Sequence, residues 1–296
     1  MTKKILVPLD GSKEAESILA ELQRVARAQD SIHLLHVLPE IPTPVGLDPT
    51  HVVALHNQSS AYLDMVRDRW LLGQNGINLV GSGDPADGIL GYALEKNIDL
   101  IAMTTHGRSG MARFLFGSVA ATVVRKAQLP VLLTRPDILQ RSRPLQRILV
   151  SVAGSETPKD LLATVKTLAG GTDADIVLFH AVPLVQDPSP QWALETPLSL
   201  HSRPEQHLQH LADMLEEEGY TAWPTVTSGD PVEKILEQAR KLDVDLIALA
   251  TQARSGLERL IAGSVAEGVL RKSPVSVLLQ KPLVIHQPAL TGEAHE

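Results

Sequence analysis

Three glycines and a serine are spaced as if to bind a phosphate group. Gly107, Gly110 and Gly117 lie in a short stretch that follows an apolar run and ends at Ser118. Glycine permits positive φ angles and a close approach of the backbone to a ligand. A helix that begins at Ser118 would add free N–H groups and a partial positive charge. The pattern therefore predicts a cradle of peptide N–H groups for an anion, with the Ser118 hydroxyl as a further donor.

Other polar residues near the ends of apolar runs have two interpretations each. The carboxylate of Asp10 could accept a hydrogen bond from a ligand, but taken alone Asp10 is better explained as a helix cap. His106 and Arg108 could approach a phosphate or be exposed on a loop. His33 and His36 are interpreted as structural. The remaining arginines are interpreted as ordinary surface charge: Arg24, Arg27, Arg67 and Arg69.

Alternating strands and helices are predicted to position these residues. Short runs of branched apolar residues predict buried strands, and apolar residues at helical spacing predict helices. The expected strands of the first half span residues 4–9, 32–38, 77–81, 100–104 and 130–134. The expected helices begin at Ser12, near residue 50, at Pro85 and at Ser118. This order predicts an α/β fold with a parallel sheet, in which ligands bind at the carboxyl ends of the strands.

The second half of the chain repeats the sequence pattern of the first half. Residues 83–134 and 229–280 are identical at about half of their positions, a period that indicates duplication of a whole domain. The predicted fold class is α/β, with two tandem five-stranded parallel-sheet domains. The expected divisions are 1–137, 145–282 and a tail, 283–296. Because unpaired edges invite pairing, we expect residues 131–134 and 277–279 to pair antiparallel within one chain.

Composition excludes several classes of protein. The 296 residues contain no cysteine, which excludes disulfides, cysteine-based zinc sites and thiol nucleophiles. A formal net charge of -7 argues against general nucleic-acid binding. Apolar runs are too short for a membrane span or a signal-peptide core, so a cytoplasmic protein is expected.

The combined motifs resemble the universal stress protein family. Thr104-Thr105-His106-Gly107, nine residues and then Gly117-Ser118 is similar to that family's G-x-x-G-x9-G-S/T nucleotide signature. Val7-Pro8-Leu9-Asp10-Gly11-Ser12 and Gly83-Asp84-Pro85 also match the family. The resemblance covers essentially the whole chain, as two tandem copies. It implies an adenine nucleotide alpha hydrolase-like, Rossmann-like fold, and many members bind ATP. In one departure, Thr104 stands where the signature has its first glycine.

The resemblance implies a nucleotide site in the first half. Asp10 and Val37 would lie at the adenine end, and Met103 and Thr104 beneath the ribose. The glycines and Ser118 would hold the phosphates. The expected cofactor-binding residues are Pro8, Leu9, Asp10, Val37, Met103, Thr104, His106, Gly107, Arg108, Gly117, Ser118 and Val119. The expected ligand is ATP, alone or with Mg²⁺. No catalytic and no metal-ligating residue is assigned.

The second half departs from this site. Of the signature positions, only Gly263 and Ser264 keep the types found in the first half. The changed positions are Ala153, Ala250, Gln252 and Ala253. Loss of a charge-assisted hydrogen bond, and alanine where a left-handed backbone is needed, both weaken binding. We therefore expect one competent and one degenerate site.

Three functions remain in view. The leading one is an ATP-binding regulator in the stress response. A slow ATPase is an alternative, although no lysine lies in the glycine loop and at most weak hydrolysis is expected. The third is a nucleotide-free, pseudo-dimeric interaction scaffold. The expected partner is an adenine nucleotide, with no nucleic acid and no membrane, and a homodimer of the whole chain stays open.

Overall fold

Strands and helices alternate along both halves of this computed structural model. It describes residues 2–39, 49–70, 75–106, 117–138, 141–152, 159–170, 173–182, 204–251 and 263–281, so the expected tail lies outside it. The first half contains β1 (Lys4–Pro8), α1 (Lys13–Glu16), α2 (Ile18–Val25), β2 (Ser31–Leu38), α3 (Pro49–Trp70), β3 (Asn75–Ser82), α4 (Pro85–Glu95), β4 (Leu100–Thr104), α5 (Ser118–Lys126) and β5 (Val131–Thr134). The second half contains β6 (Arg147–Ser151), α6 (Lys159–Ala169), β7 (Asp175–Val182), α8 (Pro204–Glu217), β8 (Ala222–Ser228), α9 (Pro231–Lys241), β9 (Leu246–Ala250), α10 (Ser264–Lys272) and β10 (Ser276–Gln280). None of the described helices is long and apolar enough to cross a membrane.

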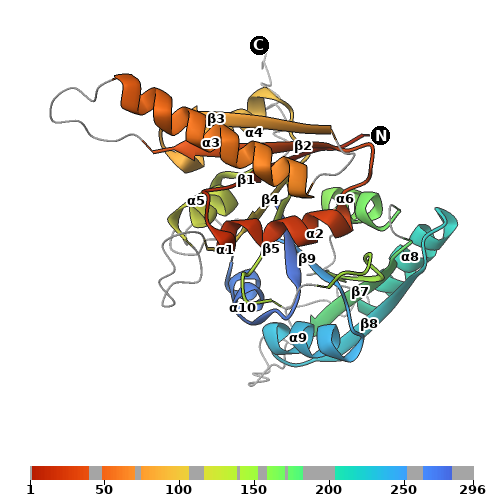
Figure 1. Ribbon diagram of the computed structural model, residues 1–296. Helices are drawn as coiled ribbons and strands as arrows, with labels where there is room; N and C mark the ends of the chain where they lie inside the picture. Colours follow the sequence, from red (N-terminus) through yellow and green to blue (C-terminus); the bar gives the residue numbers. More distant parts are fainter. Residues whose placement is uncertain are drawn as a thin grey trace, which may run out of the picture.

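The described strands form one sheet of ten, in the order β3-β2-β1-β4-β5-β10-β9-β6-β7-β8 (Figure 1). Each half supplies five parallel strands, which confirms the predicted fold class. The two halves meet at β5 and β10, which pair antiparallel with Leu132 opposite Leu278. The predicted pairing of these two strands is thereby confirmed. The β3 and β8 strands form the outer edges.

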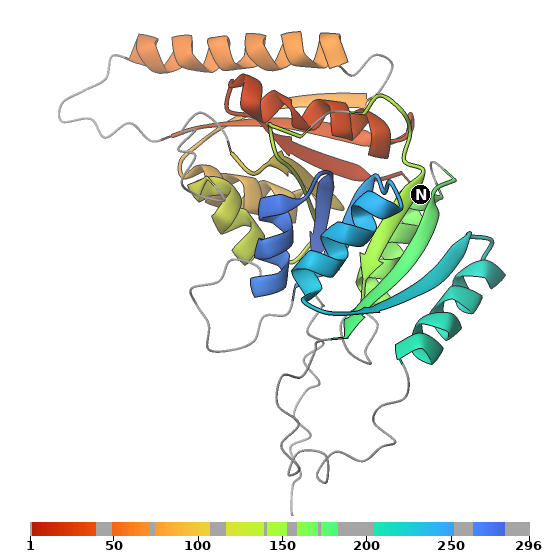
Figure 2. The ribbon, with the colours of Figure 1, turned by 90° about the horizontal axis from the view of Figure 1, so that it is seen from below.

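Helices cover both faces of the sheet and bury a core on each (Figures 1 and 2). One core gathers residues from α1, α2 and α3 together with α6 and α8 of the second half. The other gathers residues from α4, α5, α9 and α10. Both cores run across the junction of the halves. Because the sheet is covered on both faces, a strand such as β4 is buried along its whole length.

Side-chain caps start α1 and α4, two of the helices that begin near strand ends. The Ser12 hydroxyl accepts the Ala15 N–H at 3.1 Å, which confirms the predicted start of α1. At α4, Asp84 accepts the Asp87 N–H at 2.9 Å, and Pro85 occupies the first turn. The first helix was expected to be continuous, but it divides at Ser17. The Ser17 hydroxyl donates to the Glu14 carbonyl, a back-bond of the kind that bends helices.

Buried charges join the two halves. Arg24 of α2 is only 7% exposed, and its Nη2 lies 2.8 Å from Oδ1 of the fully buried Asp245 in the second half. Nη1 of Arg24 also contacts Glu21, whose pKa is raised above its ordinary value by burial, against the opposing effect of Arg24. Arg141, between the halves, reaches the same Asp245 oxygen at 2.9 Å. The interpretation of Arg24 as surface charge is therefore wrong. Arg27 was misjudged too, since its Nη2 donates to the Thr167 carbonyl of the second half at 2.6 Å.

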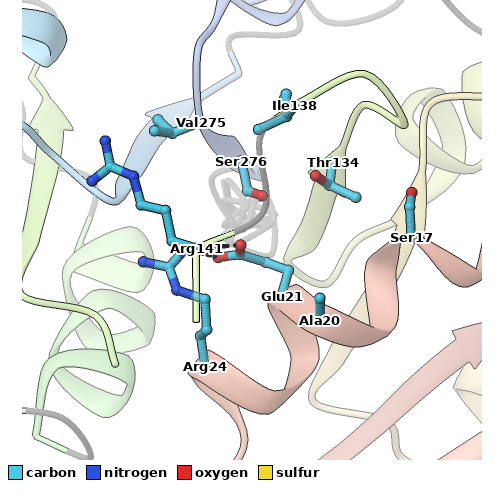
Figure 3. Close-up of a pocket in the computed structure, with 9 residues that line it drawn as sticks. All are labelled: Ser17, Ala20, Glu21, Arg24, Thr134, Ile138, Arg141, Val275 and Ser276. Carbon is cyan, nitrogen blue, oxygen red and sulfur yellow. Dashed lines mark hydrogen bonds and ion pairs between the residues drawn. The ribbon is translucent and has the colours of Figure 1, made fainter. Parts of the chain in front are cut away.

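These charged side chains surround a small cavity between the halves (Figure 3). Its volume is about 10 Å³, and side chains from α2, β5, the connecting segment and β10 line it. Figure 3 shows Glu21 and Arg24 facing Arg141 and Ser276 across it. A space of this size holds about one water molecule, so this cavity belongs to the junction and is too small for a ligand.

Candidate functional site

A larger cavity of about 280 Å³ opens at the carboxyl ends of the first-half strands. The strands β1, β2 and β4 supply its walls, together with the first turns of α4 and α5 and with Ala15 of α1. This is the edge at which ligands bind in parallel α/β sheets. The lining residues are Pro8, Leu9, Asp10, Ala15, Leu35, His36, Val37, Pro39, Pro85, Ile89, Met103, Thr104, Thr105, Gly117, Ser118, Val119 and Ala120.

Most of the residues expected at the site lie together around this cavity. They come from three segments that are distant in the sequence. The expected residues found in the lining are Pro8, Leu9, Asp10, Val37, Met103, Thr104, Gly117, Ser118 and Val119. His106 lies next to the lining but is not part of it, and its Nδ1 is 3.0 Å from the Thr105 hydroxyl. Gly107 and Arg108 lie outside the described residues.

Several lining residues were not anticipated from the sequence. His36 was interpreted as structural, and it is buried with its ring edge-on to Tyr62 at a centroid distance of 6.1 Å, but the residue also belongs to the cavity lining. Pro85 and Ile89 bring α4 into the site. The available signal was position: His36 directly precedes Val37 at the end of the same strand, and Pro85 directly follows the end of β3 and its turn.

Asp10 is tied to the start of the first helix. Its Oδ1 accepts the Ser12 N–H at 2.9 Å and the Ser12 hydroxyl at 2.5 Å. Ser12 in turn accepts the Ala15 N–H, so the three residues form a chain of hydrogen bonds at the cavity wall. The capping interpretation of Asp10 is therefore wrong, because Ser12 makes the cap and Asp10 accepts hydrogen bonds from Ser12.

Hydrogen bonds hold the residues at the two ends of the glycine loop. The Gly117 N–H donates to the Thr105 carbonyl at 2.7 Å, and the Thr105 N–H donates to the Thr134 carbonyl of β5 at 2.9 Å. At Thr104, the hydroxyl donates to the His106 carbonyl at 2.7 Å. Gly117 has a φ of -63°, so the positive φ expected of the loop glycines is not found at this one. A Cβ there would lie 3.6 Å from the Thr105 carbonyl oxygen.

The start of α5 supplies the positive end of the site. Among the described residues no side chain caps this helix, whereas Ser12 caps α1 and Asp84 caps α4. The lining residues Ser118 and Val119 therefore present the N–H groups of an uncapped helix terminus to the cavity side, where a partial positive charge accumulates. No lysine or arginine is present among the described lining residues. In the described part of the chain, no cluster of three His, Asp or Glu could hold a metal ion.

The matching edge of the second half is built differently. Ala250 stands at the position of Thr104 and has no hydroxyl to donate. Gly263, which matches Gly117, has a φ of 89° instead of -63°. His180, which matches His36, places Nδ1 2.7 Å from the Val152 carbonyl at the end of β6. Ala153, Gln252 and Ala253 lie outside the described residues.

Comparison with known proteins gives consistent matches over both halves. The model of the universal stress protein family matches residues 1–135 and 144–281. A universal stress protein of Methanocaldococcus jannaschii is 30% identical over 140 residues, which cover 46% of this chain and 82% of that one. The universal stress protein E homolog of Haemophilus influenzae is 26% identical over 216 residues, 69% of each chain.

A solved structure extends the likeness in fold to nearly the whole chain. The crystal structure of a universal stress protein from Archaeoglobus fulgidus superposes with a TM-score of 0.71 at 21% identity. The match covers 94% of this chain and 96% of that one. The arrangement of two halves in one chain is therefore shared with a known protein fold.

Proposed function

Since the chain belongs to the universal stress protein family, we propose that it is a stress-response regulator that binds ATP in its first half. The observation that carries this proposal is the cavity at the strand ends, whose lining combines apolar side chains with the start of α5. A flat apolar base and a chain of phosphates need these two environments side by side.

Each part of the nucleotide has a proposed place. Val37, Leu35 and Ile89 supply apolar surface for the adenine ring. Met103 and Thr104, at the end of β4, would lie beneath the ribose. The N–H groups at the start of α5, the Ser118 hydroxyl and the glycine loop would hold the phosphates, as the family signature implies. Arg108 and His106 would lie beside the phosphates, and Mg²⁺, when present, would be coordinated largely by phosphate oxygens.

Binding without rapid turnover fits this site better than catalysis. Hydrolysis needs a group that positions or deprotonates a water molecule at the γ-phosphate. The Asp10 carboxylate lies at the proposed adenine end and bonds Ser12 through Oδ1. For that reason we propose a protein whose nucleotide occupancy is its signal, with slow hydrolysis as the alternative.

The second half is proposed to bind ATP far more weakly. Ala250 lacks the hydroxyl of Thr104, and His180 is engaged with the Val152 carbonyl. Ala153 also removes the carboxylate found at Asp10. Loss of one charge-assisted hydrogen bond alone lowers affinity by about tenfold to a hundredfold or more.

Calorimetry with ATP on the full chain tests the proposal. We expect one site per chain in the wild-type protein. Gly117→Val adds a branched side chain next to the Thr105 carbonyl at the start of α5, where the phosphates are proposed to bind, and should raise the Kd for ATP by at least about tenfold. Gly91→Val is the matched control, because a Cβ on this exposed glycine of α4 meets nothing within 4 Å. A wild-type protein that binds no ATP, or a Gly117→Val variant with unchanged affinity, would refute the proposal.

A further inference from the structure

The residue that breaks the family signature makes a specific hydrogen bond at the base of the glycine loop. Thr104 is the last residue of β4, is only 6% exposed and lines the cavity. Its hydroxyl donates to the His106 carbonyl at 2.7 Å. A glycine at this position, as in the signature, could not make this bond. The substitution therefore adds a constraint on the backbone two residues ahead, where the chain leaves the sheet.

Neighbouring bonds give this constraint a direct path to the loop. The Thr105 N–H is fixed to β5 through the Thr134 carbonyl, and the Thr105 carbonyl receives the returning Gly117 N–H at 2.7 Å. Thr105 is 1% exposed. The hydrogen bond between Gly117 and Thr105 therefore joins the start of α5 to the end of β4. The orientation of the His106 peptide decides the direction in which the chain leaves β4.

The second half provides an internal comparison. Ala250 replaces Thr104 there, while the bond from the Thr251 N–H to the Gln280 carbonyl is retained at 2.9 Å. The return point differs, since Gly263 has a φ of 89° where Gly117 has -63°. Among the described residues, no bond from the Gly263 N–H to the Thr251 carbonyl corresponds to the one from Gly117 to Thr105. The second half, which lacks the hydroxyl of Thr104, thus also lacks the hydrogen bond that joins Gly117 to Thr105 in the first half.

We propose that Thr104 is a positioning residue for phosphate binding: its hydroxyl holds the His106 carbonyl and thereby fixes the point where the chain leaves β4, beside Gly117 at the start of α5. The role in phosphate binding rests on the function proposed above. The orientation of the loop base does not, because it concerns bonds within the protein. Thr104 acts through His106 and need not touch the phosphates itself.

Two substitutions at Thr104 separate the hydroxyl from the shape of the side chain. Thr104→Val keeps the branched shape and removes the hydroxyl, whereas Thr104→Ser keeps the hydroxyl. For Thr104→Val we expect the Kd for ATP to rise about threefold to tenfold, and the Kd for adenosine, whose ribose is proposed to lie above Thr104, to rise by a smaller factor. Thr104→Ser should bind both as the wild type does. The matched control is Thr134→Val, a buried threonine at the end of the adjacent strand.

Hydrogen exchange tests the loop base without any ligand. We expect the Gly117 amide to exchange faster in Thr104→Val than in the wild type, Thr104→Ser or Thr134→Val. If Thr104→Val changes neither this exchange nor ATP affinity, or weakens ATP and adenosine equally, the inference is wrong. If the wild type binds no ATP, the proposed function fails, and the exchange measurement still decides whether Thr104 holds the loop base.

Discussion

A single hydroxyl couples the cavity wall to the first helix. Ser12 Oγ accepts the Ala15 N–H at 3.1 Å and donates to Asp10 Oδ1 at 2.5 Å. Asp10 and Ala15 both line the cavity. The bond that starts α1 is therefore also the bond that orients a wall residue of the proposed nucleotide site.

Replacing this serine should cost helix stability. We expect Ser12→Ala to lower the free energy of unfolding by about 1 kcal/mol, because the first turn of α1 loses its side-chain acceptor. Urea denaturation measures the change. Ser17→Ala is the control: Ser17 is the N-cap residue of α2, but its hydroxyl donates to the Glu14 carbonyl and makes no side-chain cap bond to α2, so a loss within about 0.5 kcal/mol is expected. Equal losses in the two variants would contradict the assigned cap.

At the scale of single residues, the sequence identified positions better than contacts. Asp10, Val37 and Ser118 reach one cavity, as their places at strand and helix ends predicted. The hydroxyl bond of Thr104 was not foreseen, because it depends on how the peptide of His106 turns after β4. The negative φ of Gly117 was not foreseen for the same reason, since residue type permits a backbone angle without selecting it.

The strands and helices follow from short apolar patterns and from the turn and cap residues that bound them. Residues 100–104 were expected to form a strand, and β4 spans Leu100–Thr104. The helix expected from Ser118 is α5. The strand expected at 77–81 is longer in the structure, because β3 pairs with the whole of β2 from Asn75 to Ser82. Such an extension comes from the neighbouring strand, which a local pattern does not contain.

Close packing between α4 and β2 sets the shape of one cavity wall. A Cβ on Gly88 of α4 would lie 3.2 Å from both terminal methyl carbons of Val37. That distance is tighter than ordinary van der Waals contact, so the Val37 side chain would have to shift by a few tenths of an ångström. Because Val37 lines the cavity, the absence of a side chain at Gly88 helps to keep the wall in place.

Two alanine substitutions in the same helix isolate this contact. Gly88→Ala and Gly91→Ala share the gain in helix propensity, but only the first adds a crowded methyl group. We expect Gly88→Ala to be less stable than Gly91→Ala by about 1–3 kcal/mol in urea denaturation. We also expect only Gly88→Ala to weaken adenosine binding. Equal free energies of unfolding for the two variants would show that Val37 accommodates the added methyl group with no loss of stability.

At the scale of the whole molecule, the two halves are joined by charges whose partners are far apart in sequence. Arg24 and Asp245 are separated by 221 positions, and Arg141 and Asp245 by 104. Arg24 was interpreted as surface charge because its neighbours in sequence contain nothing that would bury it. Antiparallel pairing of the halves was predictable, but the ion pairs that accompany it depend on the three-dimensional path of the connecting segment.

Breaking this junction should cost far more than breaking its counterpart. Asp245 is fully buried and accepts hydrogen bonds from Arg24, Arg141 and the Gln146 N–H. Asp99 holds the matching position in the first half, is exposed and accepts only the Lys4 N–H among the contacts described. We expect Asp245→Asn to lower the free energy of unfolding by about 3–5 kcal/mol. For Asp99→Asn we expect a loss below about 1 kcal/mol. Equal losses in urea denaturation would contradict the proposed importance of the junction.

The pairing of β5 with β10 limits how the two halves can assemble with other chains. Each of these strands has a neighbour on both sides, so neither offers an open edge to another chain. The first and second halves belong to one chain, so they are always present in a one-to-one ratio. An assembly of two N-terminal halves through β5 would first require β5 and β10 to separate.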